Sequence, residues 1–127
     1  MNLAVGFFDG VHVGHRKILS RANAALTFLE HPLSVLSPER APALLMTPQE
    51  RLSAIVSALK GDGRVQALPF TCELAAESPG DFVARLRYCY PDLETVLCGP
   101  NWNFGAGGCG DAGFLRSRGI AVETVPL

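Results

Sequence analysis

Two histidines three residues apart, His12 and His15, are the side chains best suited to chemistry in this sequence. They end the segment Gly6 to His15, which reads GFFDGVHVGH, and its glycines allow a tight turn and a close approach of backbone to a ligand. An apolar run precedes the segment and helix formers follow it, so we expect a loop between a strand and a helix. The amino end of that helix would direct free N–H groups and a positive dipole end at a phosphate. Gly14 leaves room between the imidazoles, so that both can face one phosphate chain.

Histidines near a turn can also be surface residues, or a metal-binding pair formed by chance. The Phe8-Asp9-Gly10 sequence before the pair, and the strand–loop–helix setting, favour a role in phosphate binding. We therefore interpret His12 and His15 as candidate catalytic residues.

Two further segments carry weaker signals: TFLEHP at residues 27–32 and GPNWNFG at residues 99–105. Taken alone, a histidine before a proline, such as His31, is more often a loop residue than a ligand. Trp102 and Phe104 are more often anchors of a core or a loop than stacking surfaces. The order and spacing of the segments make them informative together.

The elements that position these segments alternate between strands and helices. Apolar and β-favouring runs predict strands at residues 3–7, 24–28, 65–70, 95–99 and 120–125. Helical spacing and capping signals predict helices at residues 15–22, 49–59, 81–90 and 111–118, with an extended proline-rich loop over residues 32–48. This alternation predicts an α/β fold, a Rossmann-like parallel sheet of about five strands with helices on both faces. Ligands bind outside the carboxyl ends of such strands, which places residues 8–15, 28–32, 69–72 and 100–110 along one edge.

The link between the first helix and the second strand is too short for this topology. Loops from helix to strand take about 2–6 residues, whereas almost nothing separates Ala22 from Ala25. Either the helix is cut short, or residues are missing near 22–25; we favour the second. Residues 1–127 otherwise suit a single domain with one core.

Composition limits the classes of partner. The charged fraction is 18% and the formal net charge is −1, so no nucleic acid is expected, whereas local donors can still bind a small phosphorylated molecule. No apolar run approaches the roughly 18 residues that span a bilayer, so we expect no membrane partner. The four cysteines form no C-x-x-C pair and no secretory signal precedes them. We expect reduced thiols, a cytoplasmic location and no metal ligands among the site residues.

H-x-G-H in this setting resembles the hallmark of the nucleotidylyltransferase superfamily. The succession F-D-G-V-H-x-G-H, T-F-x-x-H-P and G-x-N-x-x-F-G resembles, more narrowly, the adenylyltransferase module of bacterial FAD synthetase, which is usually fused to riboflavin kinase. Further fragments agree at residues 44–51, 69–70 and 78–82. The resemblance covers nearly the whole chain.

The resemblance implies a role for each motif residue. The ATP pocket would be lined by residues of the first motif: Gly6, Phe7, Asp9 and Gly10, with Gly14 between the histidines. His12 and His15 would contact the phosphates of ATP and stabilise charge in the transition state. Asn101 would lie near the phosphates and the flavin, as a third catalytic residue. The flavin side would be formed by Phe28, His31, Pro32 and Phe104.

The activity that this resemblance implies is transfer of the adenylyl group of ATP to FMN, giving FAD and pyrophosphate. The resemblance and the charge of ATP also imply Mg²⁺, bound with the nucleotide. A fused riboflavin kinase domain is the further partner implied.

The sequence departs from the family pattern in three ways. Glu30 stands where the family has a proline, which brings a negative charge to the flavin side, and Pro100 stands where the family usually has a polar residue. The later S-S-T-x-x-R motif is absent, which predicts a domain truncated at its C-terminus. Two alternatives stay open: an adenylyltransferase for another phosphorylated acceptor, or a non-catalytic, degenerate module that binds nucleotide or flavin.

Overall fold

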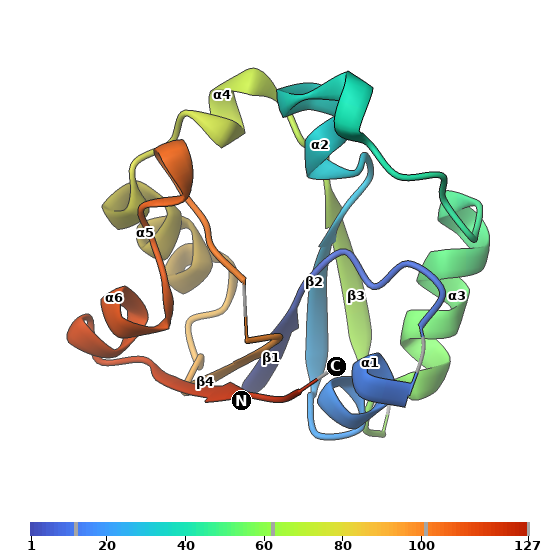
Figure 1. Ribbon diagram of the computed structural model, residues 1–127. Coiled ribbons are helices and arrows are strands. Elements are labelled where there is room, and N and C mark those ends of the chain that lie inside the picture. Colours follow the sequence, from blue (N-terminus) through green and yellow to red (C-terminus); the bar gives the residue numbers. More distant parts are fainter. Residues whose placement is uncertain (12, 62, 101, 127) are drawn as a thin grey trace.

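Five short parallel strands form one sheet in the order β3-β2-β1-β4-β5 (Figure 1). The computed structural model describes residues 1–11, 13–61, 63–100 and 102–126. The strands are β1 (Asn2–Val5), β2 (Ala24–Phe28), β3 (Arg64–Leu68), β4 (Thr95–Cys98) and β5 (Ala121–Thr124). The predicted α/β class and parallel sheet are confirmed, and each strand lies within two residues of its predicted bounds.

Strand β1 lies at the centre of the sheet. Its residue Leu3 is in register with Ala24 of β2 on one side and with Val96 of β4 on the other. The chain therefore runs outward from β1 to β3, and then returns to the far side of β1 for β4 and β5. Because all strands are parallel, their carboxyl ends meet at one edge. The reversal between β1 and β4 opens the crevice in which such folds bind ligands.

The longer helices cover both faces of the sheet (Figure 1). They are α1 (Val13–Leu19) and α3 (Pro48–Ala58) on one face, and α5 (Pro79–Cys89) and α6 (Ala112–Ser117) on the other. Successive strand residues point to opposite faces, so Ala4 packs with Ile18 and Ile55, whereas Leu3 packs with Leu86. Within the described ranges, no helix has the length and apolarity needed to cross a membrane.

Capping residues fix where the two longest helices begin. Thr47 accepts a hydrogen bond from the backbone N–H of Glu50 at 3.2 Å, and the Glu50 carboxylate accepts one from the Thr47 N–H at 2.9 Å. This capping box, with Pro48 at the first helical position, was predicted and is confirmed. The Ser78 hydroxyl caps α5 by accepting a hydrogen bond from the Asp81 N–H at 3.1 Å, with Pro79 at the first position.

The prediction of an extended loop over residues 32–48 is wrong. This stretch contains α2 (Pro32–Leu36) and the 3₁₀ helix η1 (Pro38–Arg40). Each begins with a proline, whose fixed φ suits the first position of a helix as well as a loop. Two other short helices, α4 (Cys72–Ala75) and η2 (Ala106–Gly108), were also not predicted. Helices of three to five residues have too few positions to show a periodic apolar pattern.

The first crossover closes through a short helix. The helix predicted at residues 15–22 spans Val13–Leu19 instead, and residues 20–23 form the connection to β2. The backbone N–H groups of Ser20 and Ala22 donate to the carbonyls of Arg16 and Leu19 and so turn the chain. A shortened helix, the first of the two alternatives, is what the structure contains. That residues are missing near 22–25 stays a prediction.

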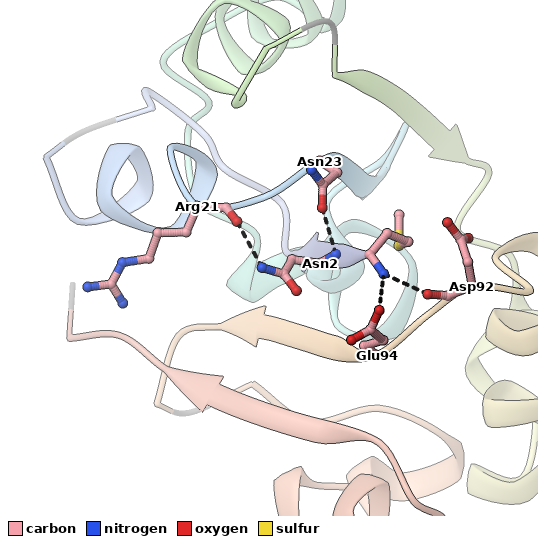
Figure 2. A network of polar contacts seen from close by, with 6 residues as sticks. Asn2, Arg21, Asn23, Asp92 and Glu94 are labelled. Carbon is pink, nitrogen blue, oxygen red and sulfur yellow. Dashed lines mark hydrogen bonds and ion pairs between the residues drawn. The ribbon is translucent and has the colours of Figure 1, made fainter.

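A polar network joins the amino ends of the strands, at the edge opposite to the carboxyl ends (Figure 2). The Asn2 N–H donates to the side-chain oxygen of Asn23 at 2.8 Å, which ties β1 to the start of β2. The Met1 ammonium donates to the Asp92 carbonyl at 2.6 Å and pairs with the Glu94 carboxylate at 3.3 Å. These contacts hold β1, β2 and the approach to β4 together at the amino edge of the sheet. The carboxyl edge, where the three motifs lie, takes no part in them.

Candidate functional site

A cavity of about 380 Å³ opens at the carboxyl edge of the sheet. Residues of all three sequence motifs line it: Gly6 and Phe7, then Phe28, His31 and Pro32, then residues 102–105. Phe70 and Phe82, to which the sequence analysis gave no individual role, complete its aromatic lining. Parallel strand ends thus bring together segments that are far apart in the sequence.

Aromatic rings form most of the cavity's large side chains. The Trp102 and Phe104 centroids lie 5.0 Å apart at an interplanar angle of 29°, and Phe104 lies 5.0 Å from Phe82 at 30°. A second pair, Phe28 and Phe70, meets edge to face at 5.4 Å. Surfaces of this kind suit the face and the edge of a flat aromatic ligand.

Glycines allow the third motif to fold back against its own aromatic ring. Phe104 and Gly110 form an isolated antiparallel bridge, with N···O distances of 3.0 and 2.8 Å. A Cβ at Gly110 would lie 2.4 Å from the Phe104 ring. Gly105 has a φ of 78°, and a Cβ there would approach Pro79 at the start of α5 to 3.0 Å. The aromatic stack therefore depends on backbone approaches that a larger residue would block.

The loop after β1 has a strained backbone. Phe8 and Val11 have φ values of 59° and 42°, which non-glycine residues, and β-branched ones above all, rarely adopt. Both side chains are buried. The Asp9 carboxylate accepts hydrogen bonds from the backbone N–H groups of Leu45 and Met46, at 2.9 and 3.3 Å. Asp9 thus holds this loop against the segment before α3, and it is not among the residues that line the cavity.

The H-x-G-H motif lies beyond this strained loop. Gly10 has a φ of 78° and packs against Leu45, while Gly14 is buried in α1. His15 is half-buried, and its ring meets that of Phe8 edge to face at 5.4 Å. Neither Gly10 nor His15 lines the aromatic cavity, although the chain passes directly from Gly6 and Phe7, which do, into the motif. Two predicted catalytic residues, His12 and Asn101, lie outside the described residues, so the placement of the two imidazoles relative to each other stays a prediction.

His31 lines the cavity and caps a helix beside it. Its Nδ1 accepts a hydrogen bond from the Leu33 N–H at 3.1 Å and so caps α2. Its ring meets Phe7 edge to face at 4.9 Å. Burial lowers the pKa of His31, the Asp9 carboxylate opposes this effect, and the Arg51 cation lowers the pKa further. His31 is therefore neutral near pH 7, with its proton on Nε2.

A model of the FAD synthetase family matches residues 1–126. The chain belongs to the FAD synthetase family. A bifunctional riboflavin kinase/FMN adenylyltransferase of Pseudomonas fluorescens is 30% identical over 140 residues, which cover 97% of this chain and 44% of the relative. An FAD synthetase of Listeria monocytogenes is 30% identical over 138 residues, which cover 98% of this chain and 55% of the relative. The chain spans about half the length of these relatives. Both matched stretches exceed its 127 residues, so the relatives carry residues without a counterpart here.

A solved structure described as a macrolide-efflux protein from Streptococcus pneumoniae also matches the chain. The TM-score is 0.77 at 22% sequence identity, covering 98% of this chain and 45% of that one. At this identity the likeness concerns the fold, which it places with the parallel α/β sheet described above.

The two single-residue departures from the FAD synthetase family pattern, Glu30 and Pro100, occupy exposed positions. The Glu30 carboxylate accepts a hydrogen bond from the Phe70 N–H at 2.7 Å, and so links the ends of β2 and β3. Pro100 is exposed, and neither residue lines the cavity. Glu30 is therefore connected to the cavity through the backbone of Phe70, which lines it.

Sequence reasoning missed one buried charge next to the cavity. Arg51 of α3 is 1% exposed and contacts the ends of β1 and β2. The motif fragment at residues 44–51 contained it, but a helical arginine is ordinarily a surface residue. Only the tertiary structure places it inside.

Proposed function

We propose that the protein transfers the adenylyl group of ATP to FMN, giving FAD and pyrophosphate. The observation that carries the proposal is the aromatic cavity at the carboxyl edge of the sheet, which is lined by Gly6 and Phe7 at the start of the loop between β1 and α1. Membership of the FAD synthetase family supports it, as do relatives named for FMN adenylylation.

The flavin ring would occupy the aromatic cavity. An isoalloxazine is flat and mostly apolar, and it would pack against the Trp102–Phe104–Phe82 stack and the Phe28–Phe70 pair. The neutral His31 presents its Nε2–H as a donor for a flavin acceptor. This arrangement favours a flavin over an acceptor without an aromatic ring, such as phosphopantetheine.

The reaction needs positioning more than it needs a base. The FMN phosphate is ionised at neutral pH, and one of its oxygens would attack the α-phosphorus of ATP in line. The bond from that phosphorus to the bridging oxygen breaks, and pyrophosphate leaves. Catalysis then depends on alignment and on donors for the developing charge, which His12 and His15 would supply.

Mg²⁺ would enter with ATP. Among the described residues, no three His, Cys, Asp or Glu side chains gather into a metal-binding group. This fits an ion that keeps several waters and binds through substrate phosphates. When bound, it would neutralise charge on the pyrophosphate that leaves.

The setting of the reaction is part of the proposal. A fused riboflavin kinase domain, as in the Pseudomonas fluorescens relative's name, would make FMN for this site. The four cysteines are free, which suits the reducing cytoplasm.

The single tryptophan of the chain provides a direct test. Because Trp102 lines the cavity, FMN bound there should quench its fluorescence. We expect saturable quenching by FMN, and formation of FAD, measured by chromatography, when ATP and Mg²⁺ are added. Phosphopantetheine and nicotinamide mononucleotide serve as alternative acceptors, and riboflavin, which lacks the attacking phosphate, is the matched control.

Three results would decide between the proposal and its alternatives. FAD formation with no product from riboflavin supports FMN adenylylation. FMN binding without FAD would instead favour a non-catalytic flavin-binding module. Product from another acceptor, but none from FMN, would make the protein a different adenylyltransferase.

A further inference from the structure

The most deeply buried charged side chain of the described residues, Arg51, makes four hydrogen bonds at the carboxyl ends of β1 and β2. Nη1 donates to the Phe7 carbonyl at 3.0 Å and to the Thr27 hydroxyl at 2.8 Å. Nη2 donates to the Phe28 carbonyl at 2.8 Å and to the Leu29 carbonyl at 3.3 Å. The Thr27 hydroxyl itself donates to the Phe7 carbonyl at 3.0 Å. One guanidinium therefore joins the carboxyl ends of two adjacent strands.

No carboxylate forms an ion pair with this cation among the residues that the structure describes. Carbonyl and hydroxyl oxygens solvate the guanidinium instead, and Asp9 contributes only a longer-range attraction. Burying a charge without a counter-ion costs folding free energy, so an apolar residue at position 51 would be expected if stability alone mattered. The planar fork of five donors explains why arginine, and not lysine, can meet several oxygens at once.

Two of the four oxygens that Arg51 binds belong to residues of the aromatic cavity. Phe7 and Phe28 both line the cavity, and the guanidinium carbon lies 4.0 Å from the centroid of the Phe7 ring. The Phe7 ring also contacts the ring of His31, which lines the same cavity. Arg51 comes from α3, whereas Phe82 comes from α5 on the other face of the sheet.

We infer that Arg51 is a positioning residue for the flavin site. Its guanidinium holds the ends of β1 and β2 at a fixed separation, and thereby sets Phe7, Phe28 and His31 at the orientation that receives the ring. This inference rests on the proposed function for the identity of the ligand. The positioning of the strand ends can be measured without any ligand.

Three variants test it, with a surface arginine as control. Arg51→Lys keeps the charge but loses the fork, and Arg51→Met removes both. Thr27→Val keeps the shape of the side chain and removes the hydroxyl between Arg51 and Phe7, so it remains informative should an Arg51 variant fail to fold. Arg64→Met changes an exposed arginine at the amino end of β3.

The first measurement is amide hydrogen exchange of the free protein. The N–H groups of Gly6 and Leu29 are bonded to Leu26 and Leu68 at the carboxyl edge, while that of Ala121 is bonded to Glu94 at the other edge. In Arg51→Lys and Thr27→Val we expect the amides of Gly6 and Leu29 to exchange about tenfold faster or more, as for loss of a charge-assisted hydrogen bond. The exchange rate of the Ala121 amide should stay as in the parent in these variants. In Arg64→Met all three amides should exchange at the parent's rates. If amide exchange became equally faster at both edges, Arg51 would contribute only to the overall stability of the protein, which would overturn the inference. Unchanged exchange at Gly6 and Leu29 would overturn it too.

The second measurement is the dissociation constant of FMN from Trp102 quenching. We expect an increase of about tenfold or more in Arg51→Lys and a smaller one in Thr27→Val. Histidine NMR should show a raised His31 pKa in Arg51→Met but not in Arg51→Lys, because only the former removes the cation. Faster exchange with an unaltered FMN affinity would contradict the role in the flavin site. A wild-type protein that binds no FMN would instead refute the proposed function, and amide exchange would still decide whether Arg51 holds the strand ends.

Discussion

At the scale of single residues, the loop after β1 places the ring of Phe8, whose backbone is strained, against the ring of His15. Phe8 has a φ of 59°, and its buried ring supports the edge of the His15 imidazole at 5.4 Å. Such strain persists only where the surroundings impose it, and here Asp9 fastens the loop to residues 45 and 46. The strained backbone therefore places the Phe8 ring against His15, a predicted catalytic residue.

Removal of that side chain should affect turnover and leave flavin binding alone. Loss of one donor to a transition state typically costs about 10²–10³ in rate, so we expect this loss in FAD formation by His15→Ala. Because His15 does not line the aromatic cavity, the FMN dissociation constant should stay unchanged. Lys17→Ala, an exposed position of the same helix, is the control. Turnover near that of the parent would argue against a phosphate contact.

His31 should make the protein's stability depend on pH. Burial lowers its folded pKa, so below about 6.5 the unfolded chain takes up the proton more readily than the folded protein. The stability that neutral His31 contributes is complete above that pH, and it is lost as the pH falls toward the lowered pKa. Protonation of Nδ1 also removes the cap of α2.

His31→Asn isolates this effect, because asparagine caps helices and does not titrate. We expect urea unfolding to show a smaller loss of stability between pH 7.5 and pH 5.5 in the variant than in the parent, in roughly the window where an ordinary histidine titrates. The other histidines are present in both proteins and cancel in the comparison. An identical pH dependence would mean that His31 does not contribute.

The residues that sequence analysis found differ in kind from those it missed. Phe28, His31 and Phe104 lie in short segments whose order along the chain indicates the family. All three residues line the cavity. Arg51 and Phe82 sit at ordinary helical positions, and their roles arise from what packs against them. The place of Asp9 in the ATP pocket stays a prediction. Its hydrogen bonds to the backbone of residues 45–46 depend on a long-range contact that no local pattern records.

At the scale of elements, strands and capped helices were predictable because their signals are local. The Thr47 capping box and the apolar run of β2 determine α3 and β2 within a residue. Helix α2 escaped prediction because its cap is a histidine, which rarely serves as one, and because prolines at its start also suit a loop. The third motif has its own element, a small bridge between Phe104 and Gly110.

Gly110→Ala should disrupt the aromatic stack. The added Cβ would lie 2.4 Å from the Phe104 ring, so the ring must move out of the stack with Trp102. We expect a loss of about 1–3 kcal/mol in the free energy of unfolding, the usual cost of overpacking, together with weaker quenching of Trp102 by FMN.

Gly80→Ala is the matched control for this experiment. A Cβ at Gly80 would meet only the Arg118 side chain, at 3.9 Å, and alanine favours the helix there. FMN binding should stay as in the parent. If Gly110→Ala bound FMN equally well, the stack would have no part in the site.

At the scale of the whole molecule, the alternation of strands and helices was enough to predict a parallel sheet but not its strand order. The order β3-β2-β1-β4-β5 follows from which faces α3 and α5 cover, and that depends on packing across the whole chain. The position of the site at the carboxyl edge was predictable nonetheless, because in any parallel sheet the carboxyl ends of all strands lie at the same edge.

The central position of β1 has a consequence for synthesis of the protein. β1 is made first, but its partner β4 begins only at Thr95. Until that segment leaves the ribosome, the nascent chain has one unpaired side of its innermost strand, with apolar residues and open backbone groups that other chains can pair with. A chaperone that shields this side, or a pause in translation just after β4, would be of most use at that stage.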